Sequence, residues 1–558
     1  MKLFATILFY GVIVVSGQCY AVGPEAVAPA GRIRGSILNS RLGRKIYSFR
    51  GVRYAEPPTG QLRFQVAKPV APWKGLFDAS EDGPSCPNLQ SNVSVSEDCL
   101  RLNVYTTKLP SSSENVSRPV MVFFHPGGFY YFSGQSLNFG PEYLMDKDIV
   151  LVTVNYRMGS LGFLSTGDSS APGNLGLKDQ VVALRWIQKN IAAFGGDPNS
   201  ITICGCSVGG LSVMLHMLSP MSKGLFHRAI VMSGSLLTVE PYPNHQKHLA
   251  KKQAELLGCP TNSSRDMLTC LKSKPVESFT ATLADFFEWH GDPILIWYPV
   301  VEPEVPGVER FLTDQPANLI RQGKFHQVPA IFGVTKDEFG GVVVGFENST
   351  KLGNNYYQDM NDNWTTIAPI SFMYERGTPR SAYLSKELRE FYFKDQPVGP
   401  ATNDGLAHIY ADSVIIFPMY RVAKLIAQYS AKPVYFYEFT YQGRYSFSMW
   451  NATTPYGIYH MDDLQYLFYM KLFFPYFNAS APEIPMVELY TSMWTSFVST
   501  GEFRHTQCSL KNVAWDRFVP EKDNYLEIDF SPSMKSGLHL DRMQEWERLF
   551  PLPQLSEK

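Results

Sequence analysis

The sequence predicts an α/β fold with a mostly parallel central sheet that helices cover on both faces. The first observation is a series of short apolar runs with little alternation of polar and apolar residues, as in strands buried on both faces. The second is that segments with helical periodicity lie between these runs, an alternation typical of parallel sheets. The predicted strands are residues 119–124, 148–156, 201–204, 229–234, 329–334 and 434–439.

The segment LKDQVVALRWIQKNIAAF, residues 177–194, predicts an amphipathic helix between the second and third of these strands. Its apolar residues recur at helical spacing and share one face. The residues that follow, Gly-Gly-Asp-Pro at 195–198, are typical of a helix end and a turn. The apolar face consists of Leu177, Val181, Leu184, Ile187 and Ile191.

The pentapeptide Gly205-Cys206-Ser207-Val208-Gly209 matches the pattern G-x-S-x-G. A chain with 42 glycines can contain this pattern by chance, and the alternative is a glycine-rich turn with a capping serine. The context favours a nucleophile at Ser207, because an apolar strand precedes it and an apolar, proline-free segment follows it. A strand, a tight turn and a helix form a nucleophile elbow, in which flanking glycines leave room for the strained serine.

A nucleophilic serine needs a base that takes its proton and a carboxylate that orients the base. His460 is the candidate base, since a nearby glycine and two aspartates indicate a loop, although an ordinary surface-loop histidine is the alternative. Glu338 follows the predicted strand 329–334, at the carboxyl end where open α/β sheets place their site residues. The order Ser207, Glu338, His460 matches that of the α/β-hydrolases.

Backbone amides at two turns are the candidate oxyanion donors. Gly127 and Gly128 follow the predicted strand 119–124, and consecutive glycines allow two amides to face one oxygen. The amide of Val208, next to the nucleophile, is the third candidate. The alternative for the glycine pair is an ordinary turn after a strand.

The charge balance and the cysteine pattern exclude some classes of function. The 558 residues include 50 basic and 51 acidic side chains without a basic run, so nucleic acid is not an expected partner. Cys and His residues do not recur at the spacing of a zinc site, so we expect no metal.

The N-terminus is typical of a secretory signal peptide. Met1 and Lys2 precede an apolar core at residues 3–15, and small residues follow it. We predict a signal peptide at residues 1–21, with cleavage after Gly17 as the alternative. A membrane anchor fits this short run poorly, and no later apolar stretch is long enough to span a bilayer. The sequence therefore predicts a secreted, extracellular protein without a membrane anchor.

Sequons and cysteines agree with secretion. Cys86 and Cys99 flank a polar loop, as Cys259 and Cys270 do, and two short-loop disulfides fit an oxidising compartment, although spacing alone leaves the connectivity open. Cys19 leaves with the signal peptide, Cys204 is expected to be a buried thiol, and Cys508 is left unpaired. The N-x-S/T sequons predict glycosylation at Asn92, Asn115, Asn262, Asn348, Asn363, Asn451 and Asn478.

Longer motifs along the chain resemble one family. The sequence is similar to the type-B carboxylesterase/cholinesterase family, and within it to secreted insect carboxylesterases and juvenile-hormone-esterase-like proteins. The resemblance covers nearly the whole chain after the signal and implies one α/β-hydrolase domain at 22–558 with large insertions. It also implies the pairs Cys86–Cys99 and Cys259–Cys270. The motifs are RGVRYAEPPTGQLRF (50–64), SEDCLRLNVYT (96–106), HPGGF (125–129), the elbow, WYPVVE (297–302), KDEFG (336–340), GIYHMDDLQYLF (457–468) and MWTSFVSTGEF (493–503).

The resemblance also implies a role for each candidate site residue. Ser207 would be the nucleophile, His460 the general base and acid, and Glu338 the carboxylate that orients the histidine. The amides of Gly127, Gly128 and Val208 would form the oxyanion hole, and Ser233 would lie close behind the triad. The implied reaction is hydrolysis of a small-molecule ester through an acyl-enzyme, without a metal or cofactor.

Three positions depart from the commonest family pattern, at Pro126, Val208 and Cys206. Cys206 replaces a glutamate of the cholinesterase branch and removes a carboxylate from the expected pocket floor. The loop between Cys86 and Cys99 also lacks the tryptophan that binds cations in cholinesterases. We therefore expect an uncharged ester as substrate, either a general, odorant or xenobiotic ester or a juvenile-hormone-type ester. Since juvenile hormone esterases carry glutamine at the position of Cys206, the first class is favoured.

A catalytically silent, esterase-like adhesion or binding domain is the alternative function. Such relatives usually lack triad residues and often carry a transmembrane segment. The three triad positions are intact in this sequence, so the enzyme is the favoured interpretation.

Overall fold

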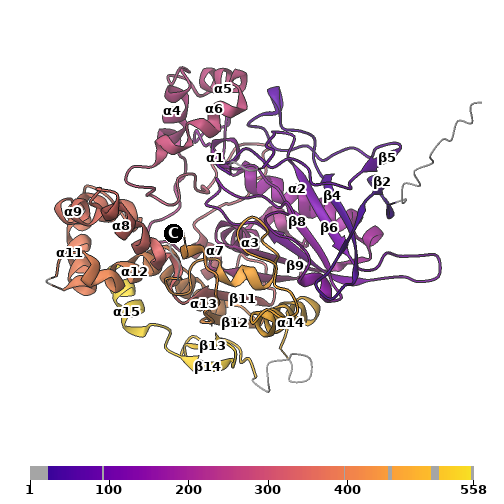
Figure 1. Cartoon of the computed structure of the whole chain (residues 1–558). Coiled ribbons are helices and arrows are strands. Elements are labelled where there is room, and N and C mark those ends of the chain that lie inside the picture. Colours follow the sequence, from indigo (N-terminus) through magenta and orange to yellow (C-terminus); the bar gives the residue numbers. More distant parts are fainter. Residues whose placement is uncertain (1–22, 91–92, 395, 450–454, 504–513, 554–558) are drawn as a thin grey trace, which may run out of the picture.

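The computed structural model describes residues 23–90, 93–394, 396–449, 455–503 and 514–553 (Figure 1). The predicted signal peptide, Asn92, Asn451 and Cys508 lie outside these residues. Within the described part of the chain, no helix is long and apolar enough to cross a membrane.

An eleven-stranded sheet forms the centre of the molecule, in the order β14-β13-β12-β11-β10-β9-β7-β8-β6-β4-β3. All neighbours from β13 to β8 are parallel, whereas β14, β6, β4 and β3 pair antiparallel at the two ends. The prediction of a mostly parallel sheet is therefore confirmed. The strands are β3 (Ser36–Asn39), β4 (Lys45–Arg53), β6 (Arg101–Thr106), β7 (Arg118–Phe124), β8 (Val150–Val154), β9 (Gly196–Cys206), β10 (Arg228–Met232), β11 (Ala330–Thr335), β12 (Val434–Phe439), β13 (Asn524–Ile528) and β14 (Ser533–Ser536).

Every predicted strand coincides with one strand of the parallel region, and the largest difference is at β9. This strand begins at Gly196, five residues before the predicted start, because Gly196 already pairs with Arg118 of β7. The register then shifts, so that Val120 pairs with Ile201. The Gly-Asp-Pro run is thus an irregularity inside the strand, and the chain turns one residue earlier, at Gly195 (φ 80°).

Helices cover both faces of the sheet, as predicted. Side chains of α2 (Leu175–Asn190), α3 (Val208–Leu218) and α13 (Phe417–Tyr429) belong to one apolar core. Those of α14 (Ile484–Thr500) belong to a second core, which also contains Cys204, Cys206 and Met232. Because side chains alternate along a strand, Ile203 packs in the first core and Cys204 in the second.

The predicted helix at 177–194 is α2 followed by one turn of 3₁₀ helix at Ile191–Phe194. It begins two residues earlier than predicted, after Asn174, which adopts a left-handed conformation (φ 58°). The five residues of the predicted apolar face are all buried, so the periodicity is confirmed.

Two insertions between strands carry most of the remaining helices. The chain between β10 and β11 contains α4 (Lys247–Leu256), α5 (Ser264–Ser273), α6 (Val276–Ala281) and α7 (Pro316–Arg321). The chain between β11 and β12 contains α8 (Val342–Lys351), α9 (Tyr356–Asp362), α10 (Trp364–Ser371), α11 (Pro379–Phe393), α12 (Asn403–Ala411) and α13. Outside the insertions lie α1 (Gly159–Phe163), α15 (Leu540–Leu549) and a small sheet of β1 (Glu25–Ala28), β2 (Gly31–Arg34) and β5 (Leu76–Asp78).

Both expected disulfides are present. Cys86 and Cys99 have Cα atoms 4.9 Å apart, and Cys259 and Cys270 have Cα atoms 5.6 Å apart. Cys204 is a free, buried thiol, as predicted. The pairings join residues close in sequence, so each disulfide stabilises a local loop.

A buried ion pair fixes the first insertion to α2. The Nζ atom of Lys178 lies 2.6 Å from Oε2 of Glu302, and both side chains are fully buried. Oε1 of Glu302 accepts hydrogen bonds from the Asn174 side chain and from the amide of Phe311. The carboxylate therefore compensates a buried ammonium group, whose charge is costly without a partner.

The substitution Glu302→Ala should lower the free energy of unfolding by about 3–5 kcal/mol, because it leaves Lys178 buried and unpaired. Urea denaturation followed by tryptophan fluorescence measures this change. The matched control is Glu304→Ala on the same segment, where an exposed carboxylate lies 3.9 Å from Arg310. The control should change stability by less than about 1 kcal/mol. Equal effects of the two substitutions would contradict the stabilising role of the buried pair between Lys178 and Glu302.

Candidate active site

Ser207 lies at a sharp turn between β9 and α3. Its backbone has φ 56° and ψ −126°, a conformation that costs a non-glycine residue free energy. The surrounding chain holds this turn, since the Ser207 amide donates to the Met232 carbonyl of β10 at 2.9 Å. The predicted strand, tight turn and helix around Ser207 are therefore present.

The two glycines of the elbow are required by close backbone contacts. A Cβ atom on Gly209 would lie 2.0 Å from the carbonyl oxygen of Phe124, at the end of β7. A Cβ atom on Gly205 would lie 2.3 Å from the Gly209 carbonyl group. Only glycine allows α3 to begin this close to β7 and β9.

Glu338 and His460 form a buried pair. Oε2 of Glu338 lies 2.6 Å from Nδ1 of His460. Oε1 of the same carboxylate accepts hydrogen bonds from the Ser233 hydroxyl at 2.6 Å and the Thr335 amide at 2.8 Å. Both carboxylate oxygens are therefore occupied, and the imidazole ring is held in one orientation.

Hydrogen bonds also join the segment that carries Glu338 to the segment that carries His460. Asp337 and Ile458 exchange two hydrogen bonds, because the Asp337 amide donates to the Ile458 carbonyl and the Ile458 amide donates to the Asp337 carboxylate. The Phe339 ring lies against the imidazole of His460, with ring centroids 4.2 Å apart. His460 is thus held in place by its own loop and by the segment that carries Glu338.

The second imidazole nitrogen of His460 is free to accept a proton. Nε2 is buried and has no hydrogen-bond partner among the described residues. His460 and Ser207 line the same cavity. A serine hydroxyl and an unpaired imidazole nitrogen on one cavity are two of the groups that proton transfer from a serine to a histidine requires.

Gly127 and Gly128 lie at the turn after β7, and we name residues 127–132 the oxyanion turn. Both glycines have positive φ, at 113° and 59°. A Cβ atom on Gly127 would lie 2.1 Å from the Tyr131 carbonyl oxygen, and one on Gly128 would lie 2.4 Å from the Tyr130 ring. Gly127, Gly128 and Val208 line the cavity together with Ser207, so the structure brings the candidate donors and the candidate nucleophile to one place.

The cavity has a volume of about 310 Å³ and a predominantly aromatic and aliphatic wall. Among the described residues, its lining contains no Asp, Glu, Lys or Arg. Val414 and Ile415 come from a turn of π-helix at Asp412–Ile416, between α12 and α13. The other apolar lining residues, which sequence patterns did not identify, are Tyr130, Tyr131, Phe132, Ile294, Leu295, Phe339, Phe447, Tyr459, Met461 and Phe473.

Cys206 differs from the expectation that it forms the pocket floor. Its side chain is fully buried in the core on the α14 side of the sheet and does not line the cavity. Burial raises the pKa of this thiol well above its ordinary value. Since residue 206 contributes no surface to the cavity, the neutral character of the cavity comes from its own wall.

The two aspartates after His460 are buried, although the sequence indicated only a loop. Asp462 accepts hydrogen bonds from the Ser446 hydroxyl and from the amides of Phe447 and Tyr459. Asp463 accepts hydrogen bonds from the Tyr490 and Tyr437 hydroxyls beneath the histidine loop. Two consecutive acids inside an otherwise apolar run were the available signal for buried carboxyl groups.

Comparisons with known proteins identify the family. The sequence profile of the carboxylesterase family matches residues 23–546. This chain belongs to the carboxylesterase family. Esterase FE4 of Myzus persicae is 38% identical over 492 residues, which cover 86% of this chain and 84% of that protein. Juvenile hormone esterase of Tribolium castaneum is 35% identical over 530 residues, which cover 90% and 87%.

A solved structure agrees with the sequence comparisons. The crystal structure of juvenile hormone esterase from Manduca sexta with OTFP covalently attached superposes with a TM-score of 0.84 and 28% identity, covering 95% of this chain and 99% of that one. The fold is therefore the α/β-hydrolase fold, and the protein is a carboxylic ester hydrolase. The alternative of a catalytically silent binding domain is not favoured.

The Asp463 carboxyl group makes the stability of this carboxylesterase depend on pH, and its contribution falls as the pH rises. Burial raises its pKa to about 6, and the negative charge of Glu338 acts in the same direction. Between the ordinary pKa near 4 and the raised value, the folded state binds more protons than the unfolded state. This group therefore stabilises the fold at low pH, and the contribution is lost as the pH rises from about 4 through about 6.

The substitution Asp463→Asn should flatten the dependence of the unfolding midpoint on pH between about 4 and 6, because it removes this titration. Thermal unfolding at a series of pH values measures the slope. The exposed Asp362→Asn is the matched control and should keep the wild-type slope. A wild-type slope in Asp463→Asn would show that the carboxyl group titrates at its ordinary pKa.

Proposed function

We propose that this carboxylic ester hydrolase cleaves uncharged esters through an acyl-enzyme on Ser207. The observation that carries the proposal is one cavity in which Ser207 and His460 lie among apolar side chains. Glu338, behind His460, completes the set of groups that a serine hydrolase requires.

The proposed reaction has two steps. His460 takes the proton of Ser207 at Nε2 as the serine oxygen attacks the ester carbonyl, and the amides of Gly127, Gly128 and Val208 stabilise the oxyanion. His460 then returns the proton to the departing alcohol, which leaves the acyl group on Ser207. Water then attacks the acyl-enzyme while His460 takes its proton, the bond to the Ser207 oxygen breaks, and His460 returns the proton to that oxygen as the acid is released. Ser233 supports the process because its hydroxyl donates a hydrogen bond to the Glu338 carboxylate.

The wall of the cavity supports an uncharged substrate. A cationic ester would lose its hydration on entry, and the described lining offers no carboxylate to compensate the charge. The names of relatives include esterases of juvenile hormone and pyrethroid hydrolases, so apolar esters are the class we propose here. This class includes general, odorant or xenobiotic esters and juvenile-hormone-type esters, and the preference for the first group that rested on Cys206 is withdrawn, because Cys206 does not line the cavity.

We also propose that the protein is secreted and glycosylated, with a signal peptide at residues 1–21 and a single domain at 22–558. Four predicted glycosylation sites, Asn115, Asn262, Asn363 and Asn478, are exposed, as an attached glycan requires. Asn348 is half-buried on α8 and is the least accessible of the described sequons.

The substitution Ser207→Ala should abolish ester turnover, because it removes the hydroxyl that forms the acyl-enzyme. Hydrolysis of p-nitrophenyl butyrate measures turnover, and mass spectrometry after treatment with an organophosphate locates the adduct. The wild-type protein should carry one phosphoryl group on Ser207 and the variant none. Retained turnover in a folded Ser207→Ala protein would refute the assignment of the nucleophile.

A matched pair of esters tests the substrate class. Butyrylthiocholine and 3,3-dimethylbutyl thiobutyrate have nearly the same shape, but only the first carries a positive charge. We expect kcat/KM to favour the neutral ester by roughly tenfold or more, since the cationic ester pays a desolvation cost that the wall does not offset. Equal values for the two esters would contradict an uncharged substrate class.

A further inference from the structure

The oxyanion turn is a strained segment of backbone. Besides its two glycines, Phe129 and Phe132 have positive φ, at 62° and 67°. Non-glycine residues rarely adopt this conformation, and it persists only where the surrounding structure holds it. The amides of Gly127 and Gly128 therefore keep their directions only if both ends of the turn are fixed.

The first end of the turn is held by the sheet, because β7 pairs with β8 on one side and β9 on the other. The second end continues into residues 133–136, which we name the clamp segment. The Gly134 carbonyl accepts hydrogen bonds from the Thr153 hydroxyl at 2.5 Å and the Asn103 amide group at 3.0 Å. The Gly134 amide donates to the Asn155 side chain at 2.8 Å.

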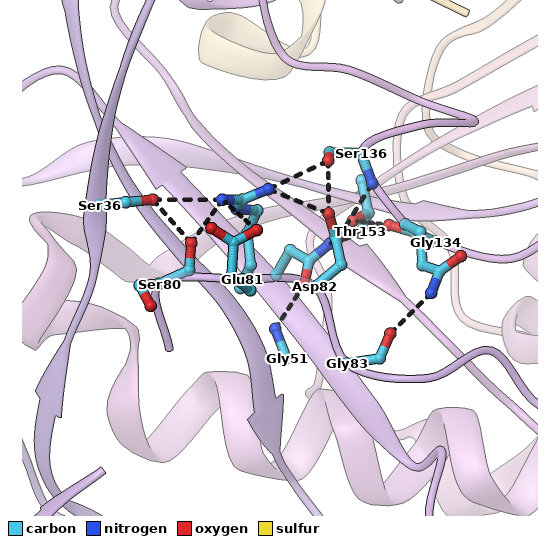
Figure 2. A network of polar contacts seen from close by, with 12 residues as sticks. Ser36, Gly51, Ser80, Glu81, Asp82, Gly83, Gly134, Ser136 and Thr153 are labelled. Carbon is cyan, nitrogen blue, oxygen red and sulfur yellow. Dashed lines mark hydrogen bonds and ion pairs between the residues drawn. The ribbon is translucent and has the colours of Figure 1, made fainter. Parts of the chain in front are cut away.

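Asp82 completes this clamp from the chain before the first disulfide. The Ser136 amide donates to Oδ1 of Asp82 at 3.1 Å, and the Ser136 hydroxyl donates to Oδ2 at 2.5 Å. Asn103 donates to Oδ1 at 2.8 Å, and the Arg50 guanidinium donates to Oδ2 at 3.1 Å. Figure 2 shows Asp82 facing Ser136 at the centre of this network.

The chain after Asp82 runs beside the turn and contacts it at further points. The Gln135 side chain donates to the Gly83 carbonyl at 2.7 Å. The Leu89 amide donates to the Tyr130 carbonyl at 3.0 Å, within the oxyanion turn itself. The segment that begins at Asp82 thus holds both the clamp segment and the turn.

We propose that Asp82 is a positioning residue for the oxyanion hole. By fixing Ser136, it holds the far end of the oxyanion turn and keeps the Gly127 and Gly128 amides aimed at the developing oxyanion. This role rests on the proposed function. Asp82 touches neither the cavity nor the triad, so it acts only through the backbone that it holds.

A carboxylate suits this position better than an amide does. Asp82 receives four donors, two on each oxygen. In Asp82→Asn one oxygen remains for Ser136 and Asn103, but an NH₂ group then faces the Arg50 guanidinium. Asparagine therefore keeps half of the Asp82 contacts and alanine keeps none of them, whereas the hydrogen bonds of Gly134 remain in both variants.

The test compares Asp82→Ala, Asp82→Asn and the control Glu81→Gln. Glu81 is the neighbouring carboxylate and is exposed, and among the described residues its side chain pairs only with Arg50, at 3.4 Å. Turnover of p-nitrophenyl butyrate gives kcat and KM separately. Inhibition by an aryl trifluoromethyl ketone is compared with inhibition by the matching methyl ketone.

The two ketones distinguish the oxyanion hole from the rest of the cavity. The trifluoromethyl ketone is attacked by Ser207, so that a C–O bond forms, the carbonyl electron pair moves to oxygen as an oxyanion, and the serine proton passes to His460. The methyl ketone has a similar shape but binds without covalent addition to Ser207. Only the first inhibitor depends on the oxyanion donors.

In Asp82→Ala, kcat should fall by about tenfold to a hundredfold, with KM within about twofold of wild type. The inhibition constant of the trifluoromethyl ketone should rise by a similar factor, and that of the methyl ketone should stay constant. Asp82→Asn should give an intermediate loss, and Glu81→Gln should match wild type.

Unchanged kcat and trifluoromethyl ketone inhibition in folded Asp82 variants would overturn the proposal, and so would an equal loss of affinity for both ketones. If Asp82→Ala does not fold, Asp82→Asn and Ser136→Ala decide by the same criteria. A wild-type protein that neither hydrolyses the ester nor forms the ketone adduct would overturn the proposed function itself, which is distinguishable from a failure at Asp82.

Discussion

The close contact between the start of α3 and the end of β7 is the constraint on which the site depends. Gly209 lies so near the Phe124 carbonyl that a single Cβ atom would occupy the space of that oxygen. This contact places the turn at Ser207 beside the turn that follows β7. The candidate nucleophile and the candidate oxyanion donors therefore share one cavity, although about 80 residues separate them in the sequence.

The parallel sheet extends the same arrangement to the other members of the site. Strands β7, β9 and β11 end at the same edge, so Gly127, Ser207 and Glu338 all lie where their strands stop. His460 comes from the longer segment after β12 and is brought to Glu338 by the exchange of hydrogen bonds between Asp337 and Ile458. Strain at Ser207, Phe129 and Phe132 is tolerated because rigid strands and a polar clamp hold these turns.

Charge is distributed so that the cavity wall itself stays neutral. The carboxylate of Glu338 is buried behind His460 and is satisfied by Ser233 and Thr335. The carboxyl group of Asp463 lies deeper and is bound by two tyrosine hydroxyls. The large insertions contribute aliphatic side chains such as Leu295 and Ile415 to the wall, whereas most of its aromatic side chains come from the turn after β7 and from the segment after β12. Because the carboxyl groups lie behind the apolar lining, the cavity is suited to apolar esters.

The sequence by itself determined the strands, the helix α2, the elbow and both disulfide pairs, the last through the resemblance to a known family. These features are local, since strand and helix periodicity, glycine spacing and short loops are legible without distant contacts. Ser207, Glu338 and His460 were singled out from their positions after strands and in a loop, and the resemblance to the family then implied their roles.

Only the tertiary structure decided which side chains line the cavity and what holds the oxyanion turn. The position of Cys206 illustrates the reason, because one residue of alternation along β9 sends its side chain to the core and not to the cavity. Asp82 illustrates it again, since its partners Arg50, Asn103 and Ser136 lie 21 to 54 residues away. Such contacts depend on how strands and loops pack in space, and no local pattern in the sequence records them.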